Sequence, residues 1–290
     1  MTRSSITIIL AAASSLGVAH AASAATVVGL TTTNRLVTFD HLAPGVLFTD
    51  VPVSGLGQGE SLVGIDLRPQ TGEVVGVSSS AIYSINPTTG VASRIGTGFS
   101  PALDAFEHGI DFNPTVDRIR AVNAGSGNRR LNPVTGGAVL PVDTAMTYAA
   151  GGSVRAVGAA YTNSVFGAPV GSTRQFVIDS NLDILGEVGS QAGGNPSFNG
   201  GVVTPIGPLG VNTGDLVGFD IFGPTGVALI STTPDTGATS ALRLLNLMNG
   251  STQFLGDIAG GTIRDITIVP APAAAMLLAP AAAGLFRRRR

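Results

Sequence analysis

The 290-residue chain contains no Cys and no Trp, all of its basic residues are Arg, and its formal net charge is −2. The lack of Cys excludes disulfides, thiolate metal sites and cysteine catalysis. Without Arg3 and the four C-terminal Arg, 11 Arg stand against 18 Asp and Glu, and this acidic balance argues against nonspecific nucleic-acid binding.

Residues 1–24 have the pattern of a secretory signal peptide. Arg3 precedes an apolar run over residues 6–16, and small residues in an A-x-A arrangement follow at 19–25. The run is too short to span a bilayer, and a signal peptidase accepts this cleavage pattern. We therefore expect export with removal of residues 1–24, which leaves a domain over residues 25–269. The alternative is a buried N-terminal helix.

The mature chain begins with three predicted strands, over residues 26–30, 35–39 and 46–51. An apolar run that contains Gly and Asp then occurs at residues 62–69 and returns at 108–114 and 216–222, with a weaker copy at 157–161. This internal repetition indicates a fold built from similar units.

A second repeated signal marks the hairpin connections. Asn-Pro-x-x-Gly occurs at residues 86–90 and 132–136, and a looser copy occupies 246–250. Asn bonds nearby backbone, Pro fixes φ, and the final Gly supplies a positive φ. Each copy therefore predicts a tight turn between two antiparallel strands.

Each repeat accommodates four short strands, and such units at intervals of about 45–60 residues are typical of propeller blades. The first unit lacks its first strand, whereas a strand of that type stands alone at 263–269. We therefore predict an all-β propeller of five four-stranded blades, closed by pairing of the N- and C-terminal strands. The alternative folds are a β-sandwich and a β-solenoid.

The run at residues 109–120, Gly-Ile-Asp-Phe-Asn-Pro-Thr-Val-Asp-Arg-Ile-Arg, is followed by Asn-Arg-Arg-Leu at 128–131, Ala-Ala-Tyr-Thr-Asn at 159–163 and Gly-Pro-Leu-Gly at 207–210. It resembles an exported bacterial family described as a domain of unknown function. The resemblance covers most of residues 26–269 and implies a propeller-like fold. It implies no activity, substrate or catalytic residue.

Carboxylates recur at equivalent places in the predicted inner strands, and Ala160 interrupts the set. A ring of carboxylates around a propeller axis is a candidate site for a hard cation such as Ca²⁺. The alternative is that each carboxylate accepts hydrogen bonds from backbone donors at its own blade junction. The residues are Asp66, Asp111, Asp220 and Asp265.

A second metal candidate is the segment Asp179, Asn181 and Asp183, whose alternating acidic pattern resembles the start of a calcium loop. Ile184 and Ser190 stand where such a loop has Gly and Glu. Because the segment falls where a hairpin turn is expected, the alternative is an Asx-rich turn.

Arg118, Arg120 and Arg130 form the candidate ligand-binding site. Arg118 and Arg120 are two residues apart and share one face of a predicted strand. Planar guanidinium groups suit carboxylates, which makes an acidic polysaccharide a candidate ligand. The alternative is internal ion pairing with Asp111 and Asp117.

No catalytic residue is predicted. Without the signal peptide only His41 and His108 remain, too few for a three-His zinc site. We expect a non-catalytic binding or structural protein whose partner is an exopolysaccharide or another surface protein. The alternative is a metal-dependent hydrolase or lactonase with carboxylates at the propeller axis, so enzymatic activity stays an open question.

The chain ends with Pro270 and Pro272, an apolar run over residues 273–286, and Arg287, Arg288, Arg289 and Arg290. This tail, residues 270–290, resembles the PEP-CTERM sorting signal, although Ala271 stands where that signal usually has Glu. The resemblance implies processing by an exosortase-type enzyme and transient membrane contact. We expect the protein in the cell envelope, at the cell surface or in the extracellular matrix.

Overall fold

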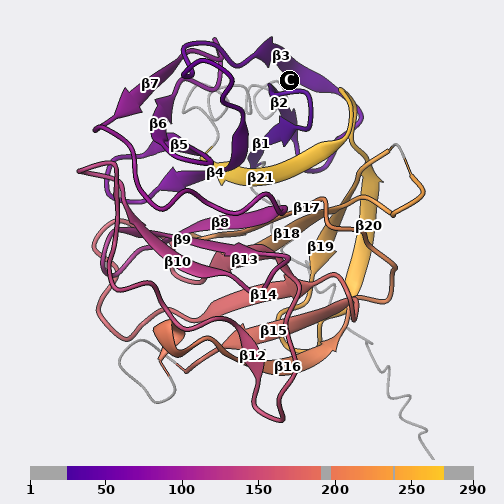
Figure 1. Cartoon of the computed structure of the whole chain (residues 1–290). Coiled ribbons are helices and arrows are strands. Elements are labelled where there is room, and N and C mark those ends of the chain that lie inside the picture. Colours follow the sequence, from indigo (N-terminus) through magenta and orange to yellow (C-terminus); the bar gives the residue numbers. More distant parts are fainter. Residues whose placement is uncertain (1–24, 191–196, 238, 271–290) are drawn as a thin grey trace, which may run out of the picture.

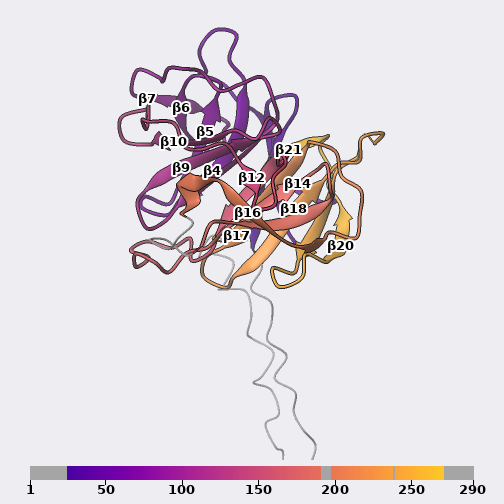
Figure 2. The same ribbon diagram turned by 60° about the horizontal axis from the view of Figure 1, so that its bottom comes forward.

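The computed structural model describes residues 25–190, 197–237 and 239–270, which form five sheets arranged as a β-propeller (Figure 1 and Figure 2). The predicted fold is confirmed, and the sandwich and solenoid alternatives are excluded. The expected signal peptide at 1–24 lies outside the described residues, as do Pro272 and the terminal Arg residues. Within the described ranges, no helix has the length and apolarity to cross a bilayer.

Each blade is an antiparallel sheet of four strands, which follow one another in the chain from the axis outward except that the inner strand of the first blade is β21. The fourth blade carries a fifth strand, β12, parallel to β16. A short helix, η1 (Phe198–Gly200), precedes β16. The first blade contains β21 (Ile263–Val269), β1 (Thr26–Thr31), β2 (Arg35–Asp40) and β3 (Leu47–Pro52), and the second contains β4 (Leu62–Arg68), β5 (Glu73–Ser78), β6 (Ile82–Ile85) and β7 (Ala92–Ile95). The third blade contains β8 (His108–Asn113), β9 (Arg118–Asn123), β10 (Asn128–Asn132) and β11 (Gly137–Ala138), and the fourth contains β13 (Ala156–Tyr161), β14 (Gln175–Asp179), β15 (Ile184–Val188), β16 (Val202–Pro208) and β12 (Thr147–Tyr148). The fifth blade contains β17 (Val217–Phe222), β18 (Val227–Thr232), β19 (Ala241–Leu245) and β20 (Thr252–Asp257).

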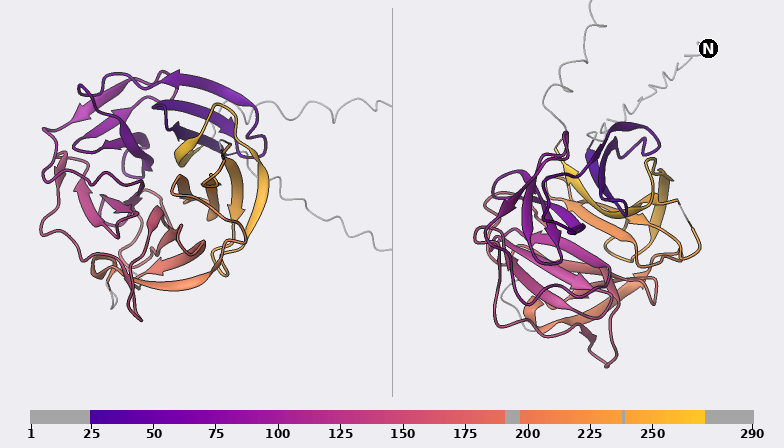
Figure 3. Two further views of the ribbon diagram at one scale, coloured as in Figure 1. Left: turned by 45° about the vertical axis from the view of Figure 1, so that its right-hand side comes forward. Right: turned by 45° about the horizontal axis from the view of Figure 1, so that its top comes forward.

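The ring is closed by the two ends of the domain, as predicted. β21 pairs with β1 in a register that places Thr26 opposite Val269, and the first blade therefore contains both terminal strands. Figure 3 shows the resulting closed circle of sheets. This pairing covers the inner edge of β1 and brings the two ends of the domain together.

The hydrophobic core is divided among the five blade junctions. One apolar cluster fills each junction, since each cluster combines side chains from two neighbouring blades. In β1, for example, Val27 packs toward the fifth blade and the adjacent Val28 toward the second. Successive strand residues point to opposite faces, and both faces are buried here, so these strands read as continuous apolar runs.

The Gly of the repeated motif is required where inner strands approach one another. A Cβ at Gly109 would lie 2.5 Å from the backbone nitrogen of Ala159 on the next inner strand. The inner strands contact each other around the axis in the order β21, β4, β8, β13 and β17. The motif is therefore a consequence of axial packing.

The Asn-Pro turns adopt the predicted geometry. In the turn between β6 and β7, the Gly90 N–H donates to the Asn86 carbonyl, and Gly90 has a φ of 73°. A Cβ on Gly90 would lie 2.1 Å from the carbonyl oxygen of Pro52 in the neighbouring blade. The same residue thus serves the turn and the junction.

We expect Gly90→Ala to lower the free energy of unfolding by about 2 kcal/mol through strain and overpacking together. Gly72 provides a matched control because its φ is 72° and no atom lies within 4 Å of its added Cβ. Urea unfolding of both variants separates the two contributions. Equal losses would show that the contact with Pro52 is unimportant.

The inner strands all end on one side of the ring, which we call the exit face. It carries the turns 69–72, 114–117 and 223–226, the longer connection 162–174, and Pro270. The opposite side, where the inner strands begin, is the entry face. The sequence did not predict the length of the 162–174 connection, which replaces the four-residue turn of the other blades.

Candidate ligand-binding site

A cavity of about 420 Å³ lies between the third and fourth blades at the exit face. It is lined by all three Arg residues that the sequence singled out, Arg118, Arg120 and Arg130. Arg118 and Arg120 alternate along β9, and Arg130 on β10 lies directly opposite Arg120. Directly opposed residues project from the same face of a sheet, which explains how the three come together.

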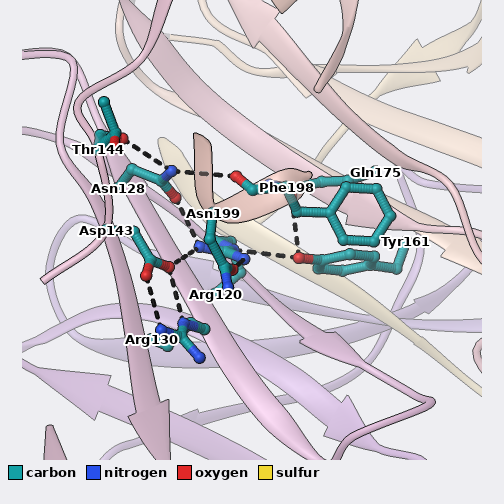
Figure 4. Close-up of polar contacts among 9 residues, drawn as sticks. All are labelled: Arg120, Asn128, Arg130, Asp143, Thr144, Tyr161, Gln175, Phe198 and Asn199. Carbon is teal, nitrogen blue, oxygen red and sulfur yellow. Dashed lines mark hydrogen bonds and ion pairs between the residues drawn. The ribbon is translucent and has the colours of Figure 1, made fainter. Parts of the chain in front are cut away.

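Arg120 is the buried centre of the site, with 2% of its surface exposed. Its guanidinium donates to the Tyr161 hydroxyl (3.1 Å), to Asn128 Oδ1 (2.7 Å) and to Asn199 Oδ1 (2.9 Å), as Figure 4 shows. Burial alone would lower the pKa of Arg120, but Tyr161 and Asp143 raise it above its ordinary value. The guanidinium therefore remains charged and fixed in place.

Asp143 is shared by two of the three Arg side chains. Its carboxylate accepts from Arg120 Nη1 at 2.5 Å and from Arg130 through two bonds of 2.8 and 2.7 Å (Figure 4). Two positive charges thus face one negative charge. A bidentate geometry of this kind holds both guanidinium groups rigidly.

Arg118 is held differently. Its Nη1 donates to the backbone carbonyls of Val116 (3.3 Å) and Asp117 (2.8 Å), and no carboxylate in the described ranges forms an ion pair with it. Three cations therefore line the cavity, and two of them pair with Asp143. Val139, Val170 and Phe198 add an apolar side to the same cavity.

The sequence named the wrong internal partners for the Arg cluster. Asp117 pairs with Arg68 of the second blade, and Asp111 accepts from the Tyr161 N–H at 3.2 Å. The actual partner, Asp143, lies in the irregular connection after β11 and has no counterpart in the repeats. Tyr161 and Asn199 were also missed as parts of the site, and no sequence signal identified them.

The repeated Asp residues link neighbouring inner strands. Asp265 accepts from the Ile65 N–H (2.9 Å), Asp66 from Phe112 (2.7 Å), and Asp220 from Ile268 (2.5 Å). Together with Asp111, these bonds join successive blades. Ala160 occupies the one position in the ring that lacks the link.

Three of these carboxylates also converge. Asp66, Asp111 and Asp220 each bring one oxygen within 4.8 Å of the others, whereas Asp265 is outside this group. Burial, followed by repulsion from neighbouring carboxylates, raises the pKa of Asp111 well above its ordinary value. Burial likewise raises the pKa of Asp220 to about 6. Asp66, Asp111 and Asp220 therefore form a candidate cation site, but each of them also accepts a hydrogen bond from the backbone of a neighbouring blade.

The segment from Asp179 to Asp183 forms a turn between β14 and β15. Asp179 Oδ1 accepts from the N–H groups of Asn181 (2.8 Å) and Leu182 (3.3 Å), and Asp183 Oδ1 accepts from Thr213 (2.8 Å). Asp183 has a φ of 53°. The two bonds to Asp179 are those of the Asx-turn alternative.

A family model described as "Domain of unknown function (DUF4394)" matches residues 35–267. A search of curated proteins found no match. Similar solved structures include a nidogen–laminin complex (12% identity, TM-score 0.40, 68% of this chain and 63% of that one). Auxiliary nutrient binding proteins from Bacteroides ovatus (16%, TM-score 0.36, 62% and 46%) and Bacteroides thetaiotaomicron (13%, TM-score 0.38, 70% and 55%) are also similar. In all three, the chain spans less than two thirds of the other protein.

Proposed function

The chain belongs to the DUF4394 family of domains of unknown function, and we propose that it is an exported, non-catalytic binding protein of the cell envelope. The Arg-lined cavity is its ligand site. The observation that carries this proposal is the charge of the cavity, where Arg118, Arg120 and Arg130 come together and, within the described residues, Asp143 is the one carboxylate that pairs with any of them. A cavity with excess cations selects an anionic group.

The candidate ligand is an acidic exopolysaccharide, or an acidic segment of another surface protein. Arg120 and Arg130 are committed to Asp143, so Arg118 is the group that offers free donors to a ligand carboxylate. Val116, Val139, Val170 and Phe198 provide the contact for the apolar part of the ligand.

Export and attachment complete the proposal. The sequence pattern at residues 1–24 supports cleavage by a signal peptidase, and the tail at 270–290 supports recognition by an exosortase-type enzyme. Mass spectrometry of protein isolated from its host is expected to find an N-terminus near Ala25 and a C-terminus near Pro270. An intact chain in the cytoplasm would contradict both.

We expect Arg118→Met to weaken retention of the protein on an acidic polysaccharide by about 10- to 100-fold, because a charge-assisted hydrogen bond contributes about 1.5–3 kcal/mol. Arg129→Met is the matched control, since Arg129 is a neighbouring Arg that also donates to backbone carbonyls but does not line the cavity. Affinity electrophoresis at low salt measures both. Equal retention of both variants would show that Arg118 does not bind the polysaccharide.

The alternative function, a metal-dependent hydrolase or lactonase, is favoured by the convergence of Asp66, Asp111 and Asp220. A bound cation would require these carboxylates to be charged. Elemental analysis, together with thermal unfolding with and without Ca²⁺, tests this function. Bound metal that is lost in Asp111→Asn would support it, whereas metal-free protein with no response to Ca²⁺ would eliminate it.

A further inference from the structure

The exit face carries exposed apolar side chains beside the Arg-lined cavity. Val116 is 51% exposed, Phe166 is 74% exposed and Val170 is 78% exposed. Val116 and Val170 line the same cavity, and Phe166 lines a second one around the axis together with Pro270. Single exposed apolar residues are common, but these three lie on one face and each lines a cavity there.

The turns that follow the inner strands on this face carry little charge. They are 69–72, 114–117, 162–174 and 223–226, and they contain two charged residues, Asp117 and Arg174, each in an ion pair. Glu73 and Arg118 flank these turns. Charged residues are more frequent on the entry face, at the starts of the inner strands, where four of them form two ion pairs. They are Glu107, Arg155, Asp215 and Arg264.

The chain also leaves the domain at the exit face. Pro270 directly follows β21, and the apolar run of the tail begins three residues later, at Ala273. Three extended residues span at most about 11 Å. A tail inserted in a bilayer therefore brings this face, and not the entry face, against the membrane surface.

We propose that the exit face docks onto a lipid bilayer, with Val116, Phe166 and Val170 entering the interfacial layer. This proposal rests on the membrane attachment in the proposed function and concerns the chain before its tail at 270–290 is removed. Burial of apolar side chains in the membrane interface stabilises docking. While the tail holds the protein at the surface, each further contact with the bilayer costs little additional translational entropy. Because Val116 and Val170 line the Arg-lined cavity, docking holds that cavity against the membrane surface, and removal of the tail releases it to ligands of the envelope.

The absence of Trp from the chain permits a direct test. Phe166→Trp in residues 25–290, which lack the signal peptide and keep the tail, places a single Trp on the exit face, and Val116→Trp places one on a different blade of the same face. Phe106→Trp is the matched control, because Phe106 is 49% exposed and lies in the connection that leads into β8 on the entry face. The proteins are combined with vesicles of phosphatidylcholine and phosphatidylglycerol, with and without brominated acyl chains.

Both exit-face reporters are expected to emit at shorter wavelength on vesicles and to be quenched by brominated lipid, while the Phe106→Trp reporter is unaffected. Protein that floats with the vesicles but leaves all three reporters unchanged overturns the docking and preserves the attachment. Protein that does not float overturns both. An emission shift that depends on protein concentration without vesicles indicates that a second copy covers the face, and also overturns the proposal.

Discussion

Asp143→Ala is expected to lower the free energy of unfolding by about 3–5 kcal/mol, because it leaves the buried guanidinium of Arg120 without its counter-charge. The side chains of Arg120 and Asp143 are only 2% and 4% exposed, so water cannot replace the lost partner. Arg130 is 25% exposed and can turn toward solvent. Urea unfolding with a fixed m-value measures the loss.

Two controls identify the cause. Asp50→Ala removes the partner of Arg35 in an ion pair whose side chains are both 37% exposed, and it is expected to cost at most about 1 kcal/mol. The double variant Arg120→Met, Asp143→Leu is expected to be more stable than Asp143→Ala, because it leaves no buried charge unpaired at Arg120. If the double variant were the less stable one, packing rather than charge would account for the loss.

The fold could be predicted because the repeats carry local geometric requirements. Gly90 had to be Gly for the turn, and Gly109 for axial packing, so both recur at equivalent places in the sequence. Ring closure followed because one strand was missing at the start and one was left over at the end. Both predictions, of the blades and of ring closure, depended on sequence patterns that recur in several blades.

The ligand site could be predicted only in part, because its parts occur once. Alternation along β9 placed Arg118 and Arg120 together, and the antiparallel register added Arg130. Asp143 and Asn199 reach the site from irregular connections of two different blades. No local sequence pattern predicts that these two connections meet, because the assembled ring of blades brings them together.

The pH dependence of stability is expected to change sharply in Asp220→Asn. Burial raises the pKa of Asp220 to about 6, against 3.8 in the unfolded chain. Between these values the folded state binds more protons, so stability falls as the pH rises through the window. Over about two pKa units this amounts to about 3 kcal/mol. The uncharged Asn escapes that loss while its Oδ1 still accepts from the Ile268 N–H.

We therefore expect Asp220→Asn to be no more stable than the wild type at pH 4 and more stable at pH 8, as measured by urea unfolding across that range. Burial lowers the pKa of His108 to about 4, which removes stability as the pH falls below about 6.5. That effect is common to both proteins and cancels in the comparison, whereas Asp66 and Asp111 leave part of the slope in the variant. A difference between the two proteins that does not change with pH would mean that Asp220 is charged throughout. A bound cation would produce this result, so it would favour the hydrolase alternative over a purely structural carboxylate ring.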